Sequence, residues 1–175
     1  MLNKRILQDE EYMNIISEYY SNSEVQKLKD IPHHDSNRLN HSLKVSYYSY
    51  KLFKRLGFNY KSAAKAGILH DLFYKRTTDY IKIRDKISIY NNHPLISLEN
   101  AKKITNLTEL EEDMIISHMW PLSTRIPKCK ESLLFGTVDA CISTKEFLSK
   151  FGYKLSYSLG VYFILFSYVV FKSNI

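Results

Sequence analysis

Apolar residues recur at steps of three and four along almost every periodic segment of this 175-residue chain. Between positions 37 and 56 they draw one stripe, formed by Leu39, Leu43, Tyr47, Tyr50, Phe53 and Leu56. Such spacing places apolar side chains on one face of a helix, whereas a half-buried strand needs strict alternation. The sequence contains no convincing alternating segment, so it predicts an all-α fold.

Capping residues and prolines mark the ends of the first helices. Residues 9–20 and 23–29 have helical spacing, and the first of these segments begins with an aspartate that suits an N-cap. Pro32 then interrupts the helical pattern. The helix that carries the stripe is therefore expected to follow a loop, with its N-cap at Asp35 or Ser36.

Later helices have boundary signals of the same kind. Gly57 ends the striped helix, and a second helix is predicted over residues 59–73. Residues 75–92 have a mixed pattern that assigns no element. Pro94 suits the first turn of a helix that continues to about Ile104.

A capping box and a proline frame the next helix. Thr108 and Glu111 lie three residues apart, as a capping box requires, and Pro121 ends the helix that they begin. A further helix is predicted over residues 131–151.

Length and composition indicate a single globular domain. The two cysteines, Cys129 and Cys141, lack CxxC spacing and follow no signal peptide, so neither a disulfide scaffold nor a zinc ribbon is expected. A cytoplasmic location is the default for such a chain. The net charge of +7 comes from 25 basic and 18 acidic residues scattered along the chain. This pattern predicts no specific nucleic-acid partner and is compatible with a small phosphorylated substrate.

Six polar side chains interrupt the apolar helical pattern, where a buried polar group is costly unless something satisfies it. In chain order they are His41, His70, Asp71, His93, His118 and Asp139. The gaps from 41 to 70, 71 to 93, 93 to 118 and 118 to 139 are 29, 22, 25 and 21 residues. Each gap is about one helix plus one turn, so successive helices of a bundle can each point a ligand at a common centre.

Several of these segments resemble the HD-domain superfamily of metal-dependent phosphohydrolases, whose pattern is H…HD…D. RLNHSLKVS resembles the first motif of that family, AGILHDLF the second and TVDAC the last. HPLISLENA and HMWPL resemble segments of small, stand-alone HD hydrolases of anaerobic Firmicutes. The resemblance covers residues 37–141 and implies an HD-domain helical bundle with a metal site between its helices.

The resemblance also implies two divalent metal ions. A first ion would be held by His41, His70, Asp71 and Asp139, and a second by His93 and His118, with Asp71 bridging the two. Imidazole and carboxylate ligands suit Mn, Fe, Co or Zn. A hydroxide bridging the ions would attack a phosphate ester or anhydride of a nucleotide-like small molecule, with His70 and Asp71 as the catalytic pair.

Other functions are open on the same ligand set. Mixed-valent di-iron oxygenases related to myo-inositol oxygenase have the same order of ligands. A non-catalytic binding module that keeps the site as structure is a third class. The sequence has no Gly-Tyr-Pro signature, which argues against hydrolysis of cyclic-di-GMP.

Basic residues near the expected ligands are candidates for binding a substrate phosphate. They are Arg38, His34, Lys75, Arg125 and Lys128. Arg38 lies one turn before His41, and an ion pair that fixes the helix is an equal alternative for it. For the others, a solvated surface or loop position is the alternative.

The C-terminus differs in composition from the rest of the chain. We predict an HD domain over residues 1–152 and an apolar C-terminal helix over residues 153–175. Positions 155 to 171 are 17 consecutive uncharged residues, the shortest length that spans a bilayer. We expect this helix to be buried or to form the seam of a homodimer. The alternative is a membrane anchor with the catalytic domain in the cytosol.

Overall fold

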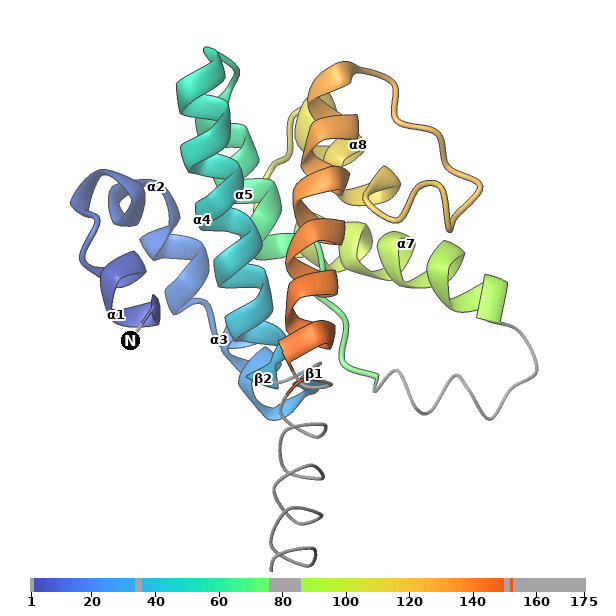
Figure 1. The fold of residues 1–175 in the computed structure, drawn as a ribbon, viewed down its shortest axis with the longest axis horizontal. Coiled ribbons are helices and arrows are strands. Elements are labelled where there is room, and N and C mark those ends of the chain that lie inside the picture. The colour runs from blue at the N-terminus through green and yellow to red at the C-terminus, as the bar shows by residue number, and fades with distance from the viewer. Residues whose placement is uncertain (1, 34–35, 76–85, 150–151, 153–175) are drawn as a thin grey trace, which may run out of the picture.

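The computed structural model describes residues 2–33, 36–75, 86–149 and 152. These residues form a bundle of helices with one very short strand pair, so the prediction of an all-α fold is confirmed (Figure 1). In chain order the helices are α1 (Leu2–Leu7), α2 (Glu10–Ser21), α3 (Ser23–Gln26), the 3₁₀ helix η1 (Lys27–Asp30), α4 (Arg38–Leu56), α5 (Tyr60–Leu69), α7 (Lys86–Ile104) and α8 (Glu109–Ser117). A further helix covers residues 130–149, is drawn in orange in Figure 1, and is called the 130–149 helix below.

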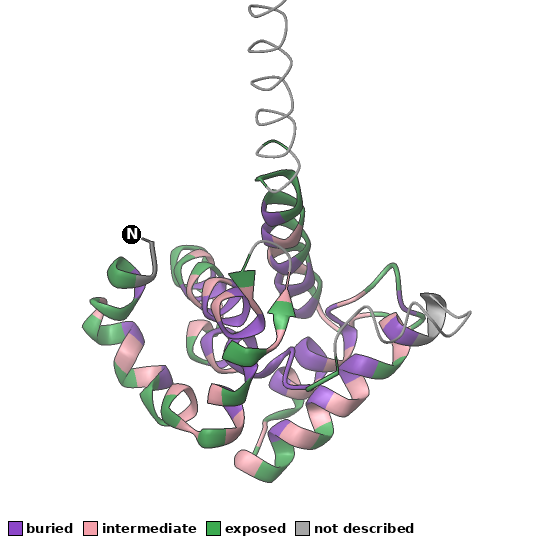
Figure 2. Cartoon of the chain, turned by 90° about the horizontal axis from the view of Figure 1, so that it is seen from below, coloured by how far each residue is buried: buried purple, intermediate pink, exposed green. Residues whose placement is uncertain are grey.

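The pair of α4 and α5 forms the centre of the bundle, and the two helices pack against each other extensively. α2 packs on α5 from one side, and α8 and α7 continue the bundle beyond it. Buried residues lie on the faces that the helices turn toward one another, and exposed residues on the outer faces (Figure 2). Tyr12 of α2, Phe53 of α4 and Phe135 of the 130–149 helix belong to one continuous apolar core.

A glycine allows α4 and α5 to approach closely. A Cβ atom on Gly67 would lie 2.3 Å from Cα of Ser46, a distance that real Cβ contacts essentially never show. The Ser46 hydroxyl donates a hydrogen bond to the Ala64 carbonyl at 2.6 Å and accepts one from the Tyr12 hydroxyl at 2.8 Å. The close approach sets the last turn of α5, and the residues that follow it, against α4.

Three of the predicted helix boundaries are confirmed. Asp9 is the N-cap of α2, and its Oδ1 accepts a hydrogen bond from the Tyr12 N–H at 3.1 Å. Gly57 ends α4 with a left-handed φ of 73°, a conformation that glycine adopts without steric cost. Thr108 and Glu111 make both hydrogen bonds of the predicted capping box at the start of α8.

The predicted N-cap of α4 was wrong. The capping residue is Asn37, one position after the expected Ser36, and its Oδ1 accepts a hydrogen bond from the Asn40 N–H at 2.9 Å. Asparagine caps helices as well as aspartate and serine do, so three neighbouring candidates could not be ranked by residue type.

A two-stranded antiparallel pair precedes α4, although no strand was expected. β1 (Pro32–His33) pairs with β2 (Ser36–Asn37), so that His33 lies opposite Ser36. Strands of two residues are too short for alternation of apolar and polar residues to reveal them.

The position of Pro94 also differs from the prediction. α7 begins at Lys86, so Pro94 lies inside this helix and not in its first turn. Proline has no N–H, so residue 94 supplies no donor to the carbonyl four residues earlier. The mixed composition of residues 75–92 concealed the first two turns of the helix.

The predicted apolar C-terminal helix over residues 153–175 lies outside the described residues, and the division into two parts therefore stays a prediction. Among the helices that the structure does describe, none combines the length and the apolar composition needed to cross a membrane.

Candidate metal centre

Six buried side chains from five helices gather at the middle of the bundle. His41 comes from α4, His70 is the C-cap of α5 with Asp71 directly after it, His93 lies on α7, His118 is the C-cap of α8, and Asp139 lies on the 130–149 helix. Their exposed fractions lie between 0 and 6 %. The structure thus brings together the six side chains that the helix spacing predicted at a common centre, and their binding of metal stays a prediction.

Three of the six side chains form a first group around Asp139. The Oδ1 atom of Asp139 lies 3.0 Å from Nε2 of His41 and 3.7 Å from Nε2 of His70. One ligand atom from each of these three residues lies within 4.8 Å of the others, a spacing that suits a single metal ion.

A second group forms around Asp71. Its Oδ1 lies 3.5 Å from Nε2 of His93 and 3.7 Å from Nε2 of His118. Its other oxygen, Oδ2, lies 4.0 Å from Nε2 of His70 and 3.9 Å from Nε of Arg38. The two oxygens of Asp71 therefore face different parts of the centre, as expected for a carboxylate that bridges two ions.

Backbone carbonyls orient three of the imidazole rings. Nδ1 of His70, His93 and His118 lies 2.8, 2.8 and 2.7 Å from the carbonyl oxygens of Gly67, Ile89 and Ile115. A carbonyl only accepts hydrogen bonds, so Nδ1 must carry the proton, and the Nε2 lone pair points at the centre. Histidines that bind metals show this arrangement, with the second nitrogen donating to a carbonyl.

The inward nitrogens have no adequate protein partner. His70 Nε2 is buried and lacks a hydrogen-bond partner among the described residues. Nε2 of His93 and Nε2 of His118 lie 3.0 Å apart, although neither neutral ring has a proton to donate there. Two lone pairs at that distance repel each other unless a cation or a proton lies between them. The donors therefore fit a divalent cation.

The electrostatics of the centre favour the metal-binding protonation states of three ligands, Asp71, His93 and His118. Burial, together with the nearby His70 and His93, lowers the pKa of His118 to about 4. Burial also lowers the pKa of His93. Burial alone would raise the pKa of Asp71, but the charges of His70, His93 and Arg38 outweigh it and lower that pKa. His93 and His118 are therefore neutral beside an ionised Asp71. Burial also lowers the pKa of His70, but the charge of Asp71 and the nearby Asp139 outweigh burial and raise it.

His41 lies between two carboxylates. Burial lowers its pKa, but hydrogen bonds to Asp139 and Glu146 outweigh burial and raise the pKa to about 10. A cation that binds at Nε2 must displace the proton held there, so metal binding and protonation compete at His41.

Glu146 is a residue of the centre that sequence reasoning missed. Its Oε2 lies 3.0 Å from Nδ1 of His41, and its Oε1 accepts a hydrogen bond from Nζ of Lys44 at 2.7 Å. The carboxylate orients the His41 ring and leaves Nε2 directed at Asp139. Its position seven residues after Asp139, two turns along one helix face, was the available signal.

Arg38 is fully buried and holds the residues after α5 in place. Its guanidinium donates to the carbonyls of Phe73 and Lys75, stacks 3.6 Å from the centroid of the Phe73 ring, and lies near Asp71. These contacts agree with the ion-pair alternative for Arg38. A contact from Arg38 to a substrate phosphate stays a prediction.

The other predicted phosphate-binding residues lie at the periphery. Lys75 and Lys128 are exposed and Arg125 is half-buried, whereas His34 lies outside the described residues. The backbone N–H of Lys128 donates to Oδ2 of the buried Asp113 at 2.9 Å, which holds the loop before the 130–149 helix.

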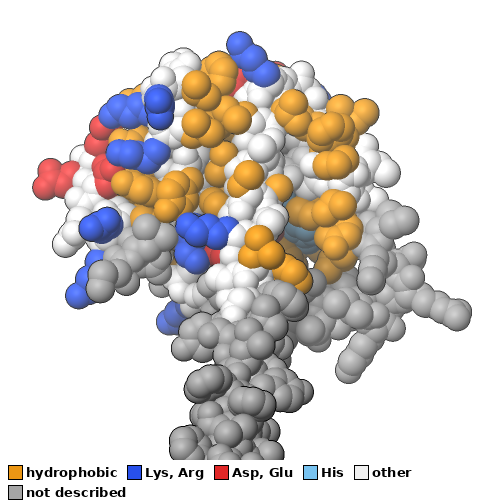
Figure 3. Space-filling model, in the orientation of Figure 1, with side chains coloured by type: hydrophobic (Ala, Val, Ile, Leu, Met, Phe, Trp, Pro, Cys, Tyr) orange, Lys and Arg blue, Asp and Glu red, His pale blue; other side chains and the backbone are white. Residues whose placement is uncertain are grey.

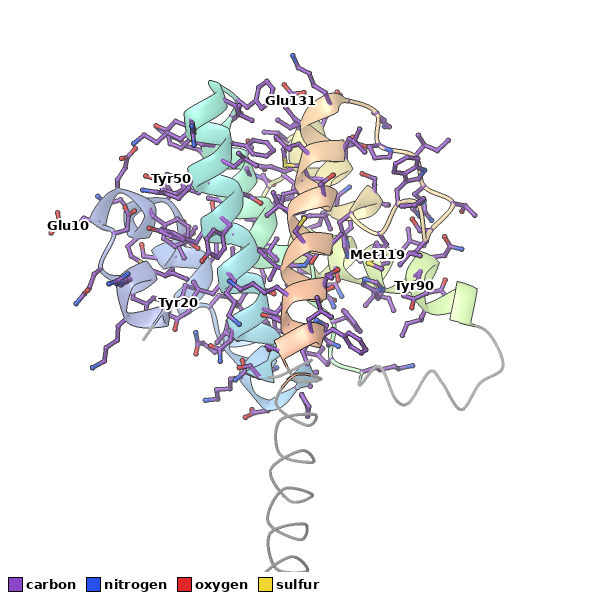
Figure 4. All side chains as sticks on the ribbon, viewed as in Figure 1. Glu10, Tyr20, Tyr50, Tyr90, Met119 and Glu131 are labelled. Atoms are coloured by element: carbon purple, nitrogen blue, oxygen red, sulfur yellow. The ribbon has the colours of Figure 1, made fainter. Side chains whose placement is uncertain are left out.

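Some histidine surface is exposed on one face of the molecule (Figure 3). Histidine side chains are visible between hydrophobic ones next to the 130–149 helix in the space-filling view (Figure 3). Tyr90 of α7 and Met119, which follows His118, lie on the same side of that helix (Figure 4). An apolar groove of about 800 Å³ lies between the 130–149 helix and the segment that follows α8, and no predicted metal ligand lines it.

A comparison with protein families gives one match. The family model of the HD domain matches residues 38–136, which is more than half of the chain. Five of the six clustered side chains lie within that range, and Asp139 lies three residues beyond it. No curated protein and no solved structure matches the chain.

Proposed function

Because the chain belongs to the HD-domain family, a family of metal-dependent hydrolases, we propose that it is a phosphohydrolase that uses two divalent metal ions. Its substrate is a phosphate ester or anhydride of a nucleotide-like small molecule. One observation carries the proposal. The Nε2 atoms of His70, His93 and His118 point into a buried centre that contains two carboxylates, and these nitrogens carry lone pairs without a hydrogen-bond donor opposite them.

The proposed first ion is held by His41, His70, Asp71 and Asp139, and the second by Asp71, His93 and His118. Divalent ions of this kind lower the pKa of water toward neutrality and stabilise the charge that develops on a phosphate during hydrolysis. Other residues of the chain orient the proposed metal ligands. Carbonyls and Glu146 fix the imidazole rings, and Arg38 keeps Asp71 in place.

The substrate enters from the face on which histidine is visible (Figure 3). Lys75, Arg125 and Lys128 are our candidates for contacts with its phosphates, because cationic side chains beside a phosphohydrolase centre stabilise the anionic ligand. The net charge of +7 raises the local concentration of such a substrate without selecting a particular one.

The test starts from protein stripped of metal with a chelator and reloaded separately with Mn²⁺, Fe²⁺, Co²⁺ or Zn²⁺ without oxygen. Phosphate release is then measured from p-nitrophenyl phosphate, bis-p-nitrophenyl phosphate and a panel of nucleotides. Asp71→Ala protein purified in parallel controls for a contaminating phosphatase. Activity that requires metal and is absent from the variant supports the proposal.

Two other outcomes would refute phosphohydrolysis. Bound iron with oxygen uptake and no phosphate release would indicate an oxygenase. Fewer than one metal ion per chain after reloading would indicate a binding module in which the cluster is only structural.

A further inference from the structure

A histidine without a predicted role lies at the edge of the metal centre. His33 belongs to β1, and the antiparallel pairing places it opposite Ser36 of β2. The N–H of Arg38 donates to the carbonyl of Ile31 at 2.9 Å, which attaches β1 to the start of α4. These backbone hydrogen bonds hold His33 beside the start of α4, the helix that carries His41.

His33 is close enough to share a cation with two of the predicted ligands. The rings of His33 and His41 lie with their centroids 4.5 Å apart and their planes tilted by 52°. One ligand atom from each of His33, His41 and Asp71 lies within 4.8 Å of the other two. His41 and Asp71 are buried, whereas His33 is half-buried, so it approaches the centre from the solvent side.

The chemistry of His41 decides which ion His33 would contact. Nδ1 of His41 faces Glu146, so only Nε2 remains for a cation, and one lone pair binds one cation. His41 nevertheless takes part in two potential ligand groups, one with His70 and Asp139 and one with His33 and Asp71. An ion bound at Nε2 of His41 therefore has the ligand atoms of both groups within reach.

We propose that His33 is an additional ligand of the first metal ion, bound from its solvent side. This inference rests on the proposed function, because it requires that an ion bind at His41. A ligand that is half exposed and lies outside the helices can leave the ion more easily than the buried ligands can. His33 thus occupies the coordination position at which an oxygen of a phosphate substrate would exchange with a protein ligand.

The experiment compares His33→Ala with His34→Ala, which removes an imidazole from the next position in the chain. Chelator-stripped protein is titrated with Mn²⁺ and with Co²⁺, and the stoichiometry and dissociation constants are measured. Loss of a residue that only orients a ligand weakens metal binding by about tenfold to a hundredfold, so loss of a direct ligand should cost at least about tenfold. We expect this loss for one ion in His33→Ala and unchanged affinity for both ions in His34→Ala.

The visible absorption spectrum of bound Co²⁺ gives a second readout that does not depend on activity. Its intensity rises when the coordination number falls, so His33→Ala should alter the spectrum of the first ion. Circular dichroism confirms that the variant is folded, which the partial exposure of His33 leads us to expect.

Two results would overturn the inference, and they differ in what else they refute. If the wild type binds two ions and His33→Ala binds both with unchanged affinity and an unchanged Co²⁺ spectrum, only the role of His33 is refuted. If the wild type binds no divalent ion, the proposed function fails together with the role of His33.

Discussion

Asp71 is the residue on which the two halves of the centre depend. Its Oδ1 faces His93 and His118, and its Oδ2 faces His70 and Arg38. Asp139, by contrast, contacts only the His41 and His70 side of the centre in the described ion pairs.

Asp71→Ala should therefore lose both metal ions together, whereas Asp139→Ala should lose only the first. Metal content per chain, measured by mass spectrometry after dialysis, separates the two variants. Hydrolysis of p-nitrophenyl phosphate by Asp71→Ala should fall by at least about a hundredfold, the typical effect of removing an electrostatic stabiliser of the transition state. Retention of two ions and full activity by Asp71→Ala would show that the ligand assignment is wrong.

Glu146 acts on the first ion through His41, because it holds the Nδ1 side of the ring at 3.0 Å. Glu146→Gln should weaken binding of the first ion by about tenfold to a hundredfold and leave the second ion unchanged. The matched control is Glu131→Gln, at the opposite end of the same helix (Figure 4). Equal metal affinities for the two variants would exclude a role of Glu146 in orienting His41.

Glu146 also contributes to the pH dependence of stability in metal-free protein. Burial raises its pKa, but hydrogen bonds from His41 and Lys44 outweigh burial and lower it from 4.5 to about 2. A lowered folded-state pKa stabilises the protein fully above pH 4.5 and loses that contribution as the pH falls toward 2. Urea unfolding of chelator-treated protein should show a smaller loss of stability between pH 5 and 3 for Glu146→Gln than for the wild type. Identical losses in both proteins would contradict the assigned ionisation of Glu146.

At the residue scale, the sequence predicted the six clustered side chains but not two residues beside them, Glu146 and His33. The six clustered residues stand out because each is polar within an apolar helical pattern and the gaps match helix lengths. Glu146 directly follows Lys145 near the end of its helix, where a glutamate beside a lysine is ordinary. His33 depends on a strand pair of two residues, and such pairing leaves no periodic signal.

At the scale of elements, local signals predicted three helix boundaries and missed the N-cap of α4 by one residue. Asp9, Gly57 and the Thr108–Glu111 box all fulfil their predicted roles. The start of α7 could not be predicted, because a proline inside the helix imitated a first-turn proline. The small residues of α5 indicated close packing, but the sequence did not show that Gly67 is packed against Ser46 of α4, because only tertiary packing pairs those positions.

Gly67 permits that contact, and a methyl group there would collide with backbone atoms of Ser46 that cannot rotate away. Gly67→Ala should reduce the free energy of unfolding by on the order of 3 kcal/mol and also weaken metal binding, because α5 carries His70 and Asp71. Gly152→Ala is the matched control, since nothing lies within 4 Å of its added Cβ. Urea titration monitored by circular dichroism measures both variants. A Gly67→Ala protein as stable as Gly152→Ala would mean that α4 and α5 do not approach this closely.

At the scale of the whole molecule, the centre joins helices that are distant in sequence. Its side chains come from α4, α5, α7, α8 and the 130–149 helix, or from the residues that directly follow them, so helices from distant parts of the chain converge on it. The fold class could be predicted because every long segment shares one periodicity. The ligand donors, however, leave lone pairs facing one another at 3.0 Å between His93 and His118, a repulsion that packing alone does not relieve.

Metal binding should therefore stabilise the whole domain cooperatively. An ion at a concentration one hundred times its dissociation constant adds about 2.7 kcal/mol to the free energy of unfolding. For a chain of this length, that gain raises the melting temperature by roughly 5 to 10 °C. Differential scanning fluorimetry should show this rise when Mn²⁺ is added to chelator-treated wild type, and no rise for Asp71→Ala. An equal rise in both proteins would place the stabilising ion outside the centre, because Asp71 faces both ligand groups and is a proposed ligand of both ions.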